Sequence, residues 1–237
     1  MANVAIITAR GGSKRIPRKN IKDFCGKPII AYPIAAAKES DLFDEVMVST
    51  DDGEIAVVAR EYGANVPFLR SVVTSDDYAT TADVLQEVLL EYEKRSCTFQ
   101  VMCCLYPTAP FVTAERLKEA YKLLEENHAE EVVPVVKFSY PPQRGFRFQD
   151  GVLSYAQPQY ILARSQDLEP MYHDAGQFYF YDVNAYRIGM QKDSAKGAYM
   201  LRAVPLFLDE MEVQDIDNLT DWKLAELKYR MLHPEIS

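Results

Sequence analysis

Val4-Ala5-Ile6-Ile7-Thr8-Ala9 runs directly into Arg10-Gly11-Gly12-Ser13-Lys14-Arg15-Ile16-Pro17-Arg18-Lys19-Asn20, and this stretch determines how the rest of the chain is interpreted. Residues 3–9 predict a strand covered on both faces, because apolar side chains follow one another without alternation. The loop after it holds six basic residues between Arg10 and Lys22 and no acidic one, although the chain has a formal net charge of −9. Adjacent glycines let backbone N–H groups converge on an anion, and the basic side chains supply charge. The loop therefore predicts a polyphosphate site.

The loop follows neither of two common phosphate-binding motifs. The one Gly-Lys pair, Gly26-Lys27, is followed by Pro28 where a P-loop has Ser or Thr. The G-x-G-x-x-G spacing of dinucleotide-binding folds is absent. A solvated basic loop and a nucleic-acid patch are alternatives to a phosphate site. The acidic remainder of the chain argues against nucleic acid, because non-specific binding to a polyanion depends on positive surface charge.

Length and composition indicate one large α/β domain, or one domain with a small insertion. The chain has 237 residues, and 48% of them are hydrophobic, which is enough for a core. No apolar run approaches the roughly 18 residues of a membrane-spanning helix, and no basic segment precedes apolar residues as in a signal peptide. The four cysteines form no C-x-x-C motif and are expected to be reduced thiols of a cytoplasmic protein. The three histidines are scattered and do not predict a metal site.

Strands and helices alternate along the chain, which predicts right-handed βαβ units and a parallel sheet. Pro33 is compatible with a helix only near its first turn or at a kink, and Asp51 or Asp52 is expected to cap the helix that ends at Gly63. The final helix is amphipathic and is expected to pack on the sheet. The expected strands cover residues 3–9, 45–49, 65–69, 99–105, 131–136, 177–182 and 198–204. The other expected helices cover 29–38, 82–95, 114–127, 183–190 and 218–232.

The segment from residue 138 to residue 186 differs in texture, because it holds 12 of the chain's aromatic residues. Asp150-Gly151 lies between two short β-prone runs, Phe146–Gln149 and Val152–Tyr155, and predicts a hairpin turn. Aromatic residues at period 2 are most often core. A sugar pocket and a dimer surface are the other interpretations of this segment.

Two polar loops are candidates for the same rim as the basic loop. Ser75-Asp76-Asp77-Tyr78-Ala79-Thr80-Thr81 predicts a turn and a helix N-cap. Tyr106-Pro107-Thr108-Ala109-Pro110 follows a predicted central strand, and ligands of open α/β sheets bind beyond the carboxyl ends of the strands. A proline-stiffened turn without a ligand is the alternative for this second loop.

An acidic pair near the end of the chain is a candidate metal site. Asp215 and Asp217 point to the same face of an extended chain, and two neighbouring carboxylates repel unless a cation offsets them. Mg²⁺ typically takes one or two carboxylates together with phosphate oxygens. In the alternative interpretation Asp217 caps the last helix and Asp215 is solvated.

The segment A-R-G-G-S-K-R-I-P-R-K-N after a first strand resembles the signature of the CMP-sugar synthetases that activate nine-carbon keto acids, and the resemblance extends over nearly the whole chain. This family comprises the cytidylyltransferases for N-acetylneuraminic, legionaminic and pseudaminic acids. Tyr172-His173-Asp174-Ala175-Gly176-Gln177-Phe178-Tyr179 is most similar to the pseudaminic acid branch. The synthetase for the eight-carbon sugar Kdo has a different loop and ranks lower.

The resemblance implies a fold and a domain organisation. The fold is α/β, a three-layer αβα Rossmann-like nucleotidyltransferase with a mainly parallel sheet and a small dimerisation insertion. Residues 1–237 form a single nucleotidyltransferase domain. The aromatic-rich insertion at about 138–180 serves dimerisation and sugar binding, and exchange with a second subunit helps close each active site.

The resemblance also assigns roles to individual residues. Arg10 and Lys19 act at the α-phosphate, Lys14 at the β- and γ-phosphates, Asn20 orients ribose or phosphate, and Asp215 and Asp217 hold Mg²⁺. The implied catalytic residues are Arg10, Lys19 and Asp215. Nucleotide binding is implied for Ala9, Arg10, Gly11, Gly12, Ser13, Lys14, Lys19, Asn20, Thr80, Thr81, Tyr106, Pro107 and Thr108, with Tyr106 at a position where many members have Gln. Sugar binding is implied for Arg164, Gln166, His173, Asp174 and Gln177.

The implied reaction condenses CTP with pseudaminic acid to give the CMP-sugar and pyrophosphate. CMP-N-acetylneuraminate or CMP-legionaminate synthesis is the alternative within the family. A non-catalytic nucleotide-sugar binding protein is the alternative from a different class, and the presence of both Asp215 and Asp217 favours the enzyme. The expected partners are CTP, an acidic nine-carbon sugar and a second copy of the chain, with no nucleic acid and no membrane.

Overall fold

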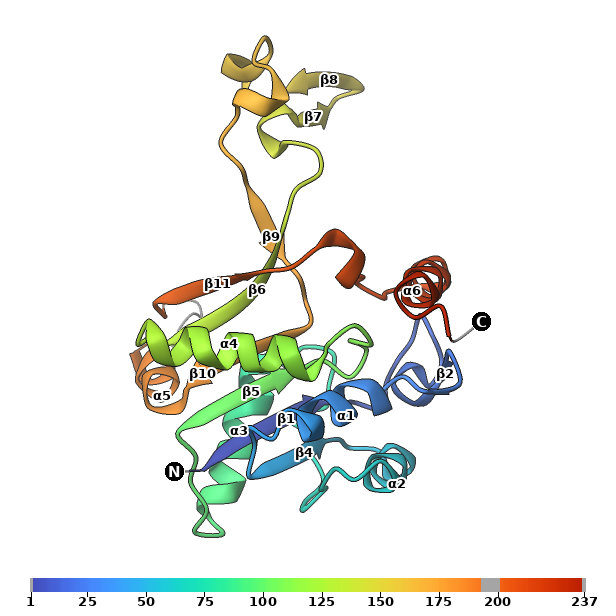
Figure 1. The fold of residues 1–237 in the computed structure, drawn as a ribbon, viewed down its shortest axis with the longest axis vertical. Coiled ribbons are helices and arrows are strands. Elements are labelled where there is room, and N and C mark those ends of the chain that lie inside the picture. The colour runs from blue at the N-terminus through green and yellow to red at the C-terminus, as the bar shows by residue number, and fades with distance from the viewer. Residues whose placement is uncertain (1, 193–200, 236–237) are drawn as a thin grey trace.

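The computed structural model describes residues 2–192 and 201–235, and within these ranges its centre is a seven-stranded mixed sheet (Figure 1). The strand order is β11-β6-β10-β5-β1-β4, and β9 pairs with β6. β1, β4, β5, β6 and β11 share one direction, whereas β9 and β10 run against them. The bounds are β1 Asn3–Thr8, β4 Glu45–Ser49, β5 Val101–Leu105, β6 Glu131–Lys137, β9 Tyr172–Asp174, β10 Phe178–Asp182 and β11 Ala203–Phe207. The predicted mainly parallel α/β sheet is confirmed.

Helices cover both faces of the sheet and give it three layers. One hydrophobic cluster joins one face to α1 (Ala31–Glu39), α2 (Gly53–Glu61) and α4 (Ala114–Glu126). A second cluster joins the other face to α3 (Thr81–Glu93) and α5 (Val183–Lys192). The remaining helix is α6 (Leu219–Leu232). The short elements are β2 Asp23–Phe24, β3 Lys27–Pro28, β7 Phe146–Gln149, β8 Val152–Tyr155, η1 Lys19–Ile21, η2 Pro142–Arg144, η3 Pro158–Tyr160, η4 Ser165–Asp167 and η6 Glu210–Glu212.

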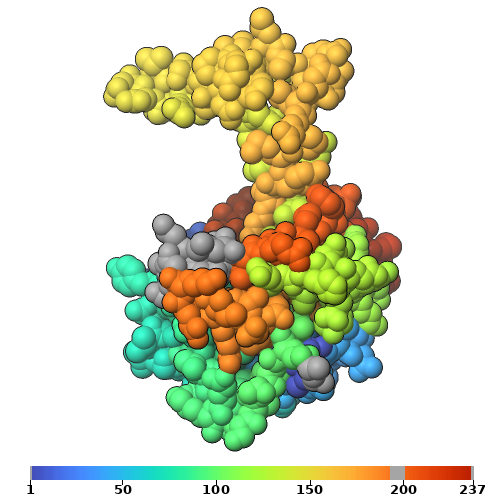
Figure 2. Space-filling view, turned by 90° about the vertical axis from the view of Figure 1, so that its left-hand side faces the viewer, coloured from blue at the N-terminus to red at the C-terminus, as the bar shows by residue number. Residues whose placement is uncertain are grey.

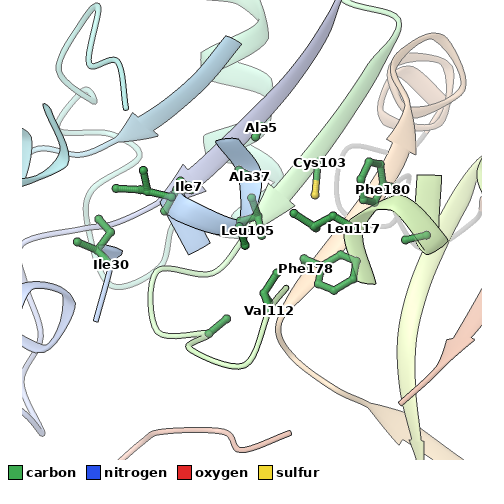
Figure 3. Packing of buried hydrophobic residues seen from close by; sticks show 14 of the residues in the cluster. Ala5, Ile7, Ile30, Ala37, Cys103, Leu105, Val112, Leu117, Phe178 and Phe180 are labelled. Atoms are coloured by element: carbon green, nitrogen blue, oxygen red, sulfur yellow. The ribbon is translucent and has the colours of Figure 1, made fainter. Parts of the chain in front are cut away.

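The alternation along β1 shows why this strand is apolar throughout. Ala5 and Ile7 belong to the cluster under α1 and α4, which Figure 3 shows from close by. Val4 and Ile6 belong to the cluster under α3 and α5. All four side chains are fully buried, because a central strand of a covered sheet has no solvent face. The predicted burial on both faces is confirmed.

Local sequence signals fix the helix starts. Asp52 caps α2 and accepts hydrogen bonds from the N–H groups of Glu54 and Ile55. Thr80 caps α3 in a capping box with Asp83. Pro33 is the third residue of α1, inside the first turn, where its missing N–H interrupts no helical hydrogen bond.

Two strand predictions need correction. Residues 65–69 do not form a strand, because the only pairing is an isolated bridge between Met47 and Asn65. Pro67 has no N–H to continue a ladder, which explains why the pairing stops. The strand expected at 198–204 is β11 and starts later, at Ala203, where it pairs with Glu131; part of the expected range lies outside the described residues.

The last helix packs elsewhere than predicted. α6 does not pack on the central sheet; its buried Trp222 and Tyr229 contact a separate cluster around Phe24 and Tyr32. Phe24 lies 5.5 Å from both Trp222 and Tyr229 between ring centroids, in edge-to-face geometry. α6 therefore covers the segment between β1 and α1, which carries the basic loop. Within the described residues, each helix is too short or too polar to cross a bilayer.

Between β6 and β9 the chain leaves the sheet and forms an arm, defined here as residues 138–171. The arm carries the predicted hairpin of β7 and β8 and projects from the body on a narrow neck (Figures 1 and 2). Its aromatic residues are not core, since Phe146 and Phe148 are 57% and 73% exposed. The aromatic residues of β10 are core, with Phe178 and Phe180 fully buried. The aromatic-rich segment therefore has two structural roles.

We expect Trp222→Ala to lower the free energy of unfolding by about 3–5 kcal/mol, because it removes a buried aromatic side chain and leaves a cavity beside Phe24. Leu227→Ala on the same helix is the matched control, since Leu227 is 58% exposed and should cost less than about 0.5 kcal/mol. Urea unfolding of both variants measures the difference. Equal losses would contradict the packing of α6 described above.

Candidate active site

A pocket of about 480 Å³ opens where the basic loop and the loop after β5 meet. Both loops follow carboxyl ends of parallel strands, the usual place for a ligand in such a sheet. The volume is within the range of small-molecule sites. Most of the predicted nucleotide residues line this pocket: Arg10, Ser13, Lys14, Lys19, Asn20, Thr80, Thr81, Tyr106, Pro107 and Thr108.

Three predicted nucleotide residues do not line the pocket. Ala9 is fully buried and continues the ladder by donating its N–H to the carbonyl of Ser49. The N–H of Gly11 donates to the Asp51 carboxylate at 2.8 Å, so it is already engaged within the protein. Gly12 has open space on its Cα. The two glycines therefore differ in their surroundings, and Gly11 is the one that packs closely within the loop.

Gly11 is required because the loop passes close to Asp52. A Cβ added at Gly11 would lie 2.8 Å from Oδ2 and 3.0 Å from Cβ of Asp52. Asp52 cannot move away easily, because it caps α2 and pairs with both terminal nitrogens of Arg18. The hydrogen bond from Arg18 lowers the pKa of Asp52 to about 2. This ion pair attaches the basic loop to the start of α2.

The cations at the mouth of the pocket are exposed and paired with one carboxylate. Arg10 donates to Oδ1 of Asp77 at 3.1 Å and to the carbonyl of Asp76 at 3.0 Å. Lys14 pairs with the other oxygen of Asp77 and lowers the pKa of that carboxyl. Arg10 and Lys14 are 40% and 75% exposed in their side chains. Exposed pairs of this kind contribute little, so a polyphosphate can replace Asp77 as the partner.

Deeper in the pocket, the structure brings the basic loop against the predicted acidic pair. Lys19 donates its Nζ to the carbonyl of Ile216 at 2.7 Å, between Asp215 and Asp217 in sequence. Burial lowers the pKa of Lys19, and the charges of Asp217 and Asp215 oppose that shift. Arg15 pairs with Asp217 at 2.8 Å, and Asp217 lines the pocket.

Asn20 supports the loop from beneath. It is 5% exposed and donates its side-chain amide to the carbonyl of Arg10 at 2.8 Å. Asn20 therefore fixes the backbone that carries the Arg10 side chain, in addition to its own place on the pocket wall.

Sequence reasoning missed four charged residues of the pocket, Arg15, Arg70, Asp76 and Asp77. Arg70 is 8% exposed and donates to Oγ and the carbonyl of Ser49 at 3.0 and 2.6 Å. A charged residue after the apolar run Val66–Leu69 was the signal that could have marked it. Arg15 belongs to the basic loop and Asp77 to the turn at 75–81. Arg15 pairs with Asp217, 202 positions away, and Asp77 pairs with Arg10, 67 positions away, and no local pattern reveals such distant partners.

A tyrosine pair continues the pocket wall toward β9. The Tyr106 hydroxyl lies 3.4 Å from Oγ1 of Thr81, and its ring meets that of Tyr179 edge-on at 5.7 Å. Tyr179 donates to both carboxylate oxygens of Asp174 at 2.8 and 2.9 Å. Burial raises the pKa of Tyr106 and of Tyr179, so both hydroxyls remain protonated. The network joins the pocket to a predicted sugar-binding residue.

The five predicted sugar-binding residues are divided between the arm and the sheet. Arg164 and Gln166 are in the arm, where Arg164 pairs with Asp167 at 2.7 Å. His173 and Asp174 belong to β9, and the His173 ring packs edge-on against Phe138. Gln177 is 3% exposed and donates to the carbonyl of Glu212 at 2.5 Å. None of the five lines the pocket described above, and their contact with a sugar stays a prediction.

The donor set suits a divalent cation held together with a phosphate. Within residues 2–192 and 201–235, no group of three or more His, Cys, Asp or Glu side chains gathers as a complete protein site. Asp215 and Asp217 supply hard oxygen ligands beside the cationic pocket. Such a pair fits Mg²⁺, which commonly completes its octahedron with substrate phosphates and water. The two carboxylates are the residues that would hold it.

We expect Gly11→Ala to lower the free energy of unfolding by about 1–3 kcal/mol, because the new methyl group would displace Asp52 from its cap and ion pair. Gly12→Ala is the matched control in the next position, since a Cβ there meets nothing within 4 Å. Chemical denaturation measures both variants. An equally stable Gly11→Ala protein would show that the loop does not depend on this close approach.

Comparison with known proteins shows the family to which the chain is related. The family model described as cytidylyltransferase matches residues 4–224. The chain is 40% identical over 98% of both chains to a pseudaminic acid cytidylyltransferase of Campylobacter jejuni. It is 34% identical over 95% of both chains to a CMP-N,N'-diacetyllegionaminic acid synthase of Legionella pneumophila.

Among solved structures, CMP:2-keto-3-deoxy-manno-octonic acid synthetase complexed with CTP has a similar fold. The TM-score is 0.68 at 18% identity, with 99% of this chain and 100% of that chain covered. The Rossmann-like nucleotidyltransferase fold implied by the sequence is thereby confirmed. From the family model and the identities to relatives of the same length, the chain belongs to the cytidylyltransferase family.

Proposed function

We propose that this protein condenses CTP with pseudaminic acid, a nine-carbon α-keto acid sugar, to give CMP-pseudaminic acid and pyrophosphate. The observation that carries the proposal is the pocket at the strand ends, which gathers Arg10, Lys14 and Lys19 around a volume suited to a nucleotide. The choice of sugar is supported by the relatives named for pseudaminic acid, which are 40% identical along the whole chain.

The reaction is a nucleotidyl transfer. The anomeric hydroxyl of the sugar attacks the α-phosphorus of CTP, a new C–O–P linkage forms, and the bond to the β-phosphate breaks as pyrophosphate leaves. Charge develops on the leaving oxygens, so positioning and electrostatic stabilisation dominate the catalysis. We assign Arg10 and Lys19 to the α-phosphate and Lys14 to the β- and γ-phosphates. Asp77 pairs with Arg10 and Lys14 and gives way to the triphosphate.

We assign the base and ribose to the opposite wall. Thr80, Thr81 and Tyr106 supply hydroxyl groups there, and Arg70 adds a buried cation. A site of fixed, buried polar groups discriminates strongly against a base that leaves them unpaired. Asn20 orients the ribose or a phosphate while holding the Arg10 backbone.

We further propose that Asp215 and Asp217 hold Mg²⁺ at the phosphate side of the pocket. A bound Mg²⁺ would supply Lewis-acid stabilisation of charge on phosphate oxygens and lower the pKa of the attacking hydroxyl. Arg15 pairs with Asp217 at 2.8 Å and holds that carboxylate at the pocket wall.

We propose that the active unit is a homodimer in which the arm of one protomer reaches the pocket of its partner. The β7–β8 hairpin exposes Phe146, Phe148, Val152 and Leu153, each more than half exposed. An isolated two-stranded hairpin is marginally stable in water, and an apolar patch of this kind is typical of an interface. The arm, which includes Arg164 and Gln166, projects away from the body (Figure 2), so a partner's pocket is the site that these residues would complete. A cytoplasmic location stays a prediction.

Pyrophosphate release tests the reaction and the sugar together. With CTP and Mg²⁺, we expect release with pseudaminic acid and at least about tenfold slower turnover with N-acetylneuraminic acid, because a changed hydroxyl pattern leaves buried polar groups unpaired. Release only with N-acetylneuraminic or legionaminic acid would keep the reaction and replace the sugar. CTP binding without release for any of the three acids would favour a non-catalytic nucleotide-sugar binding protein.

Mixed dimers test the shared site. Lys14→Ala impairs the pocket and Arg164→Ala impairs the arm, so each homodimer is expected to have two defective sites. After subunit exchange, a heterodimer has one site made from an intact pocket and an intact arm. With random exchange, turnover should return to about a quarter of the wild-type value. Heterodimers that form, as measured by mass spectrometry, without any gain in turnover would place Arg164 outside the partner's site.

A further inference from the structure

The segment that carries the acidic pair has little secondary structure of its own. After β11 the chain forms η6 and then runs without helix or strand from Val213 to Asn218. Irregular backbone must find hydrogen-bond partners elsewhere. Lys228 of α6 donates to the carbonyls of Glu210 and Val213 at 3.0 and 2.8 Å. The position of Asp215 and Asp217 therefore depends on side chains from other elements.

The strongest of these attachments is a forked ion pair from α4. Arg116 donates Nε and Nη2 to the two carboxylate oxygens of Glu212 at 3.2 and 2.8 Å. Arg116 is the third residue of α4, and its N–H is bonded to the cap Thr113. Its Nη1 also pairs with Glu119 at 2.7 Å, which holds the guanidinium in one orientation. A fork to both oxygens fixes direction as well as distance.

A second attachment comes from Gln177, the residue just before β10, and reaches the pocket wall directly. Gln177 donates its side-chain amide to the carbonyl of Glu212, and its own carbonyl accepts the N–H of Tyr106 at 2.8 Å. One buried residue thus bonds both to a residue of the pocket wall and to the segment before Asp215. Glu212 receives both attachments, through its carboxylate from Arg116 and through its carbonyl from Gln177.

We infer that Arg116 and Gln177 are positioning residues for the transfer reaction, which hold the Asp215–Asp217 segment at a fixed place against the nucleotide pocket. This inference rests on the proposed function, in which the two aspartates hold the metal. The Tyr106–Thr108 loop of the pocket wall leads from β5 toward α4, which carries Arg116, and Gln177 bonds to the backbone of Tyr106. Both attachments therefore start beside this loop.

The role is positioning and not only stability. Val213 and Ile216 are 8% and 1% exposed and already fix the segment to two hydrophobic clusters. Removing the fork therefore leaves the segment attached but less restricted between its two buried anchors, where Asp215 lies. A displacement of about 1 Å at a reacting group can cost about a hundredfold in rate. Mutation of residues that orient the metal ligands typically lowers metal affinity 10- to 100-fold.

Manganese binding tests this inference with a readout other than turnover. Mn²⁺ replaces Mg²⁺ as the probe, α,β-methylene-CTP replaces CTP, and electron paramagnetic resonance measures free Mn²⁺ in the ternary mixture. We expect Arg116→Gln, Glu212→Gln and Gln177→Met each to weaken Mn²⁺ binding about tenfold while the affinity for the nucleotide alone changes less than about threefold. The Arg116→Gln/Glu212→Gln double variant should bind Mn²⁺ as tightly as either single variant, because both changes break the same Arg116–Glu212 ion pair.

Arg95→Gln is the matched control, because Arg95, just after α3, forms an ion pair with Glu91 of that helix at 2.7 Å, away from the acidic pair. It should leave Mn²⁺ binding unchanged. Glu212→Gln keeps the shape of the side chain and guards against a variant that fails to fold, which a thermal melt checks. Wild-type Mn²⁺ affinity in all three variants would overturn the positioning role alone. An Asp215→Ala protein that binds Mn²⁺ like wild type would overturn the metal role in the proposed function, and the inference with it.

Discussion

Six positively charged side chains lie in one short loop and repel one another unless each finds a partner. The need for these partners determines how most of the site is built. Each cation has a partner: Arg18 pairs with Asp52 and Glu54, Arg10 and Lys14 with Asp77, Arg15 with Asp217, Lys19 with the Ile216 carbonyl, and Lys22 with the face of Trp222. The partners come from the segment after β4 with the start of α2, from the loop before α3, and from α6 with the segment before it. The loop therefore draws three distant parts of the chain to one end of the sheet.

One of these ion pairs is structural, whereas the pairs at the mouth of the pocket can be replaced by a ligand. Asp52 is tied to Arg18, to the helix start of α2 and to the close passage of Gly11, so its pairing is structural. Asp77 is half exposed and makes only salt-screened contacts with Arg10 and Lys14. A triphosphate offers those two cations more charge at the cost of one weak carboxylate contact. The Arg18–Asp52 pair thus holds the loop in place, while Arg10 and Lys14 at the mouth of the pocket remain available to bind a triphosphate.

Local patterns in the sequence were sufficient for the elements and for much of the pocket. The unbroken apolar run of β1, the two helix caps and the loop after β5 all act over a few residues. Of the two candidate caps of α2 the structure uses Asp52, and within the predicted turn at 75–81 it uses Thr80. The wrong predictions concern structure that depends on a partner far away in the sequence or on a missing backbone N–H. Pro67 ends the pairing beside β4, and α6 packs on Phe24, about 200 positions before it, because an amphipathic pattern shows a buried face and not its partner. Arg70, Asp77 and the Arg116–Glu212 fork depend on contacts between remote segments in the same way.

The connection between β9 and β10 is where the two halves of the proposed reaction meet. Asp174, at the end of β9, accepts the hydroxyl of Tyr179, whose ring lies against that of Tyr106 on the pocket wall. Three residues later, Gln177 bonds to the backbone of Tyr106 and to that of Glu212. The connection between the two strands therefore bonds both to the Tyr106 side of the pocket and to the segment that precedes the acidic pair. Because Gln177 bonds to both, a shift of the Tyr106 wall and a shift of the segment before Asp215 are coupled through one buried residue.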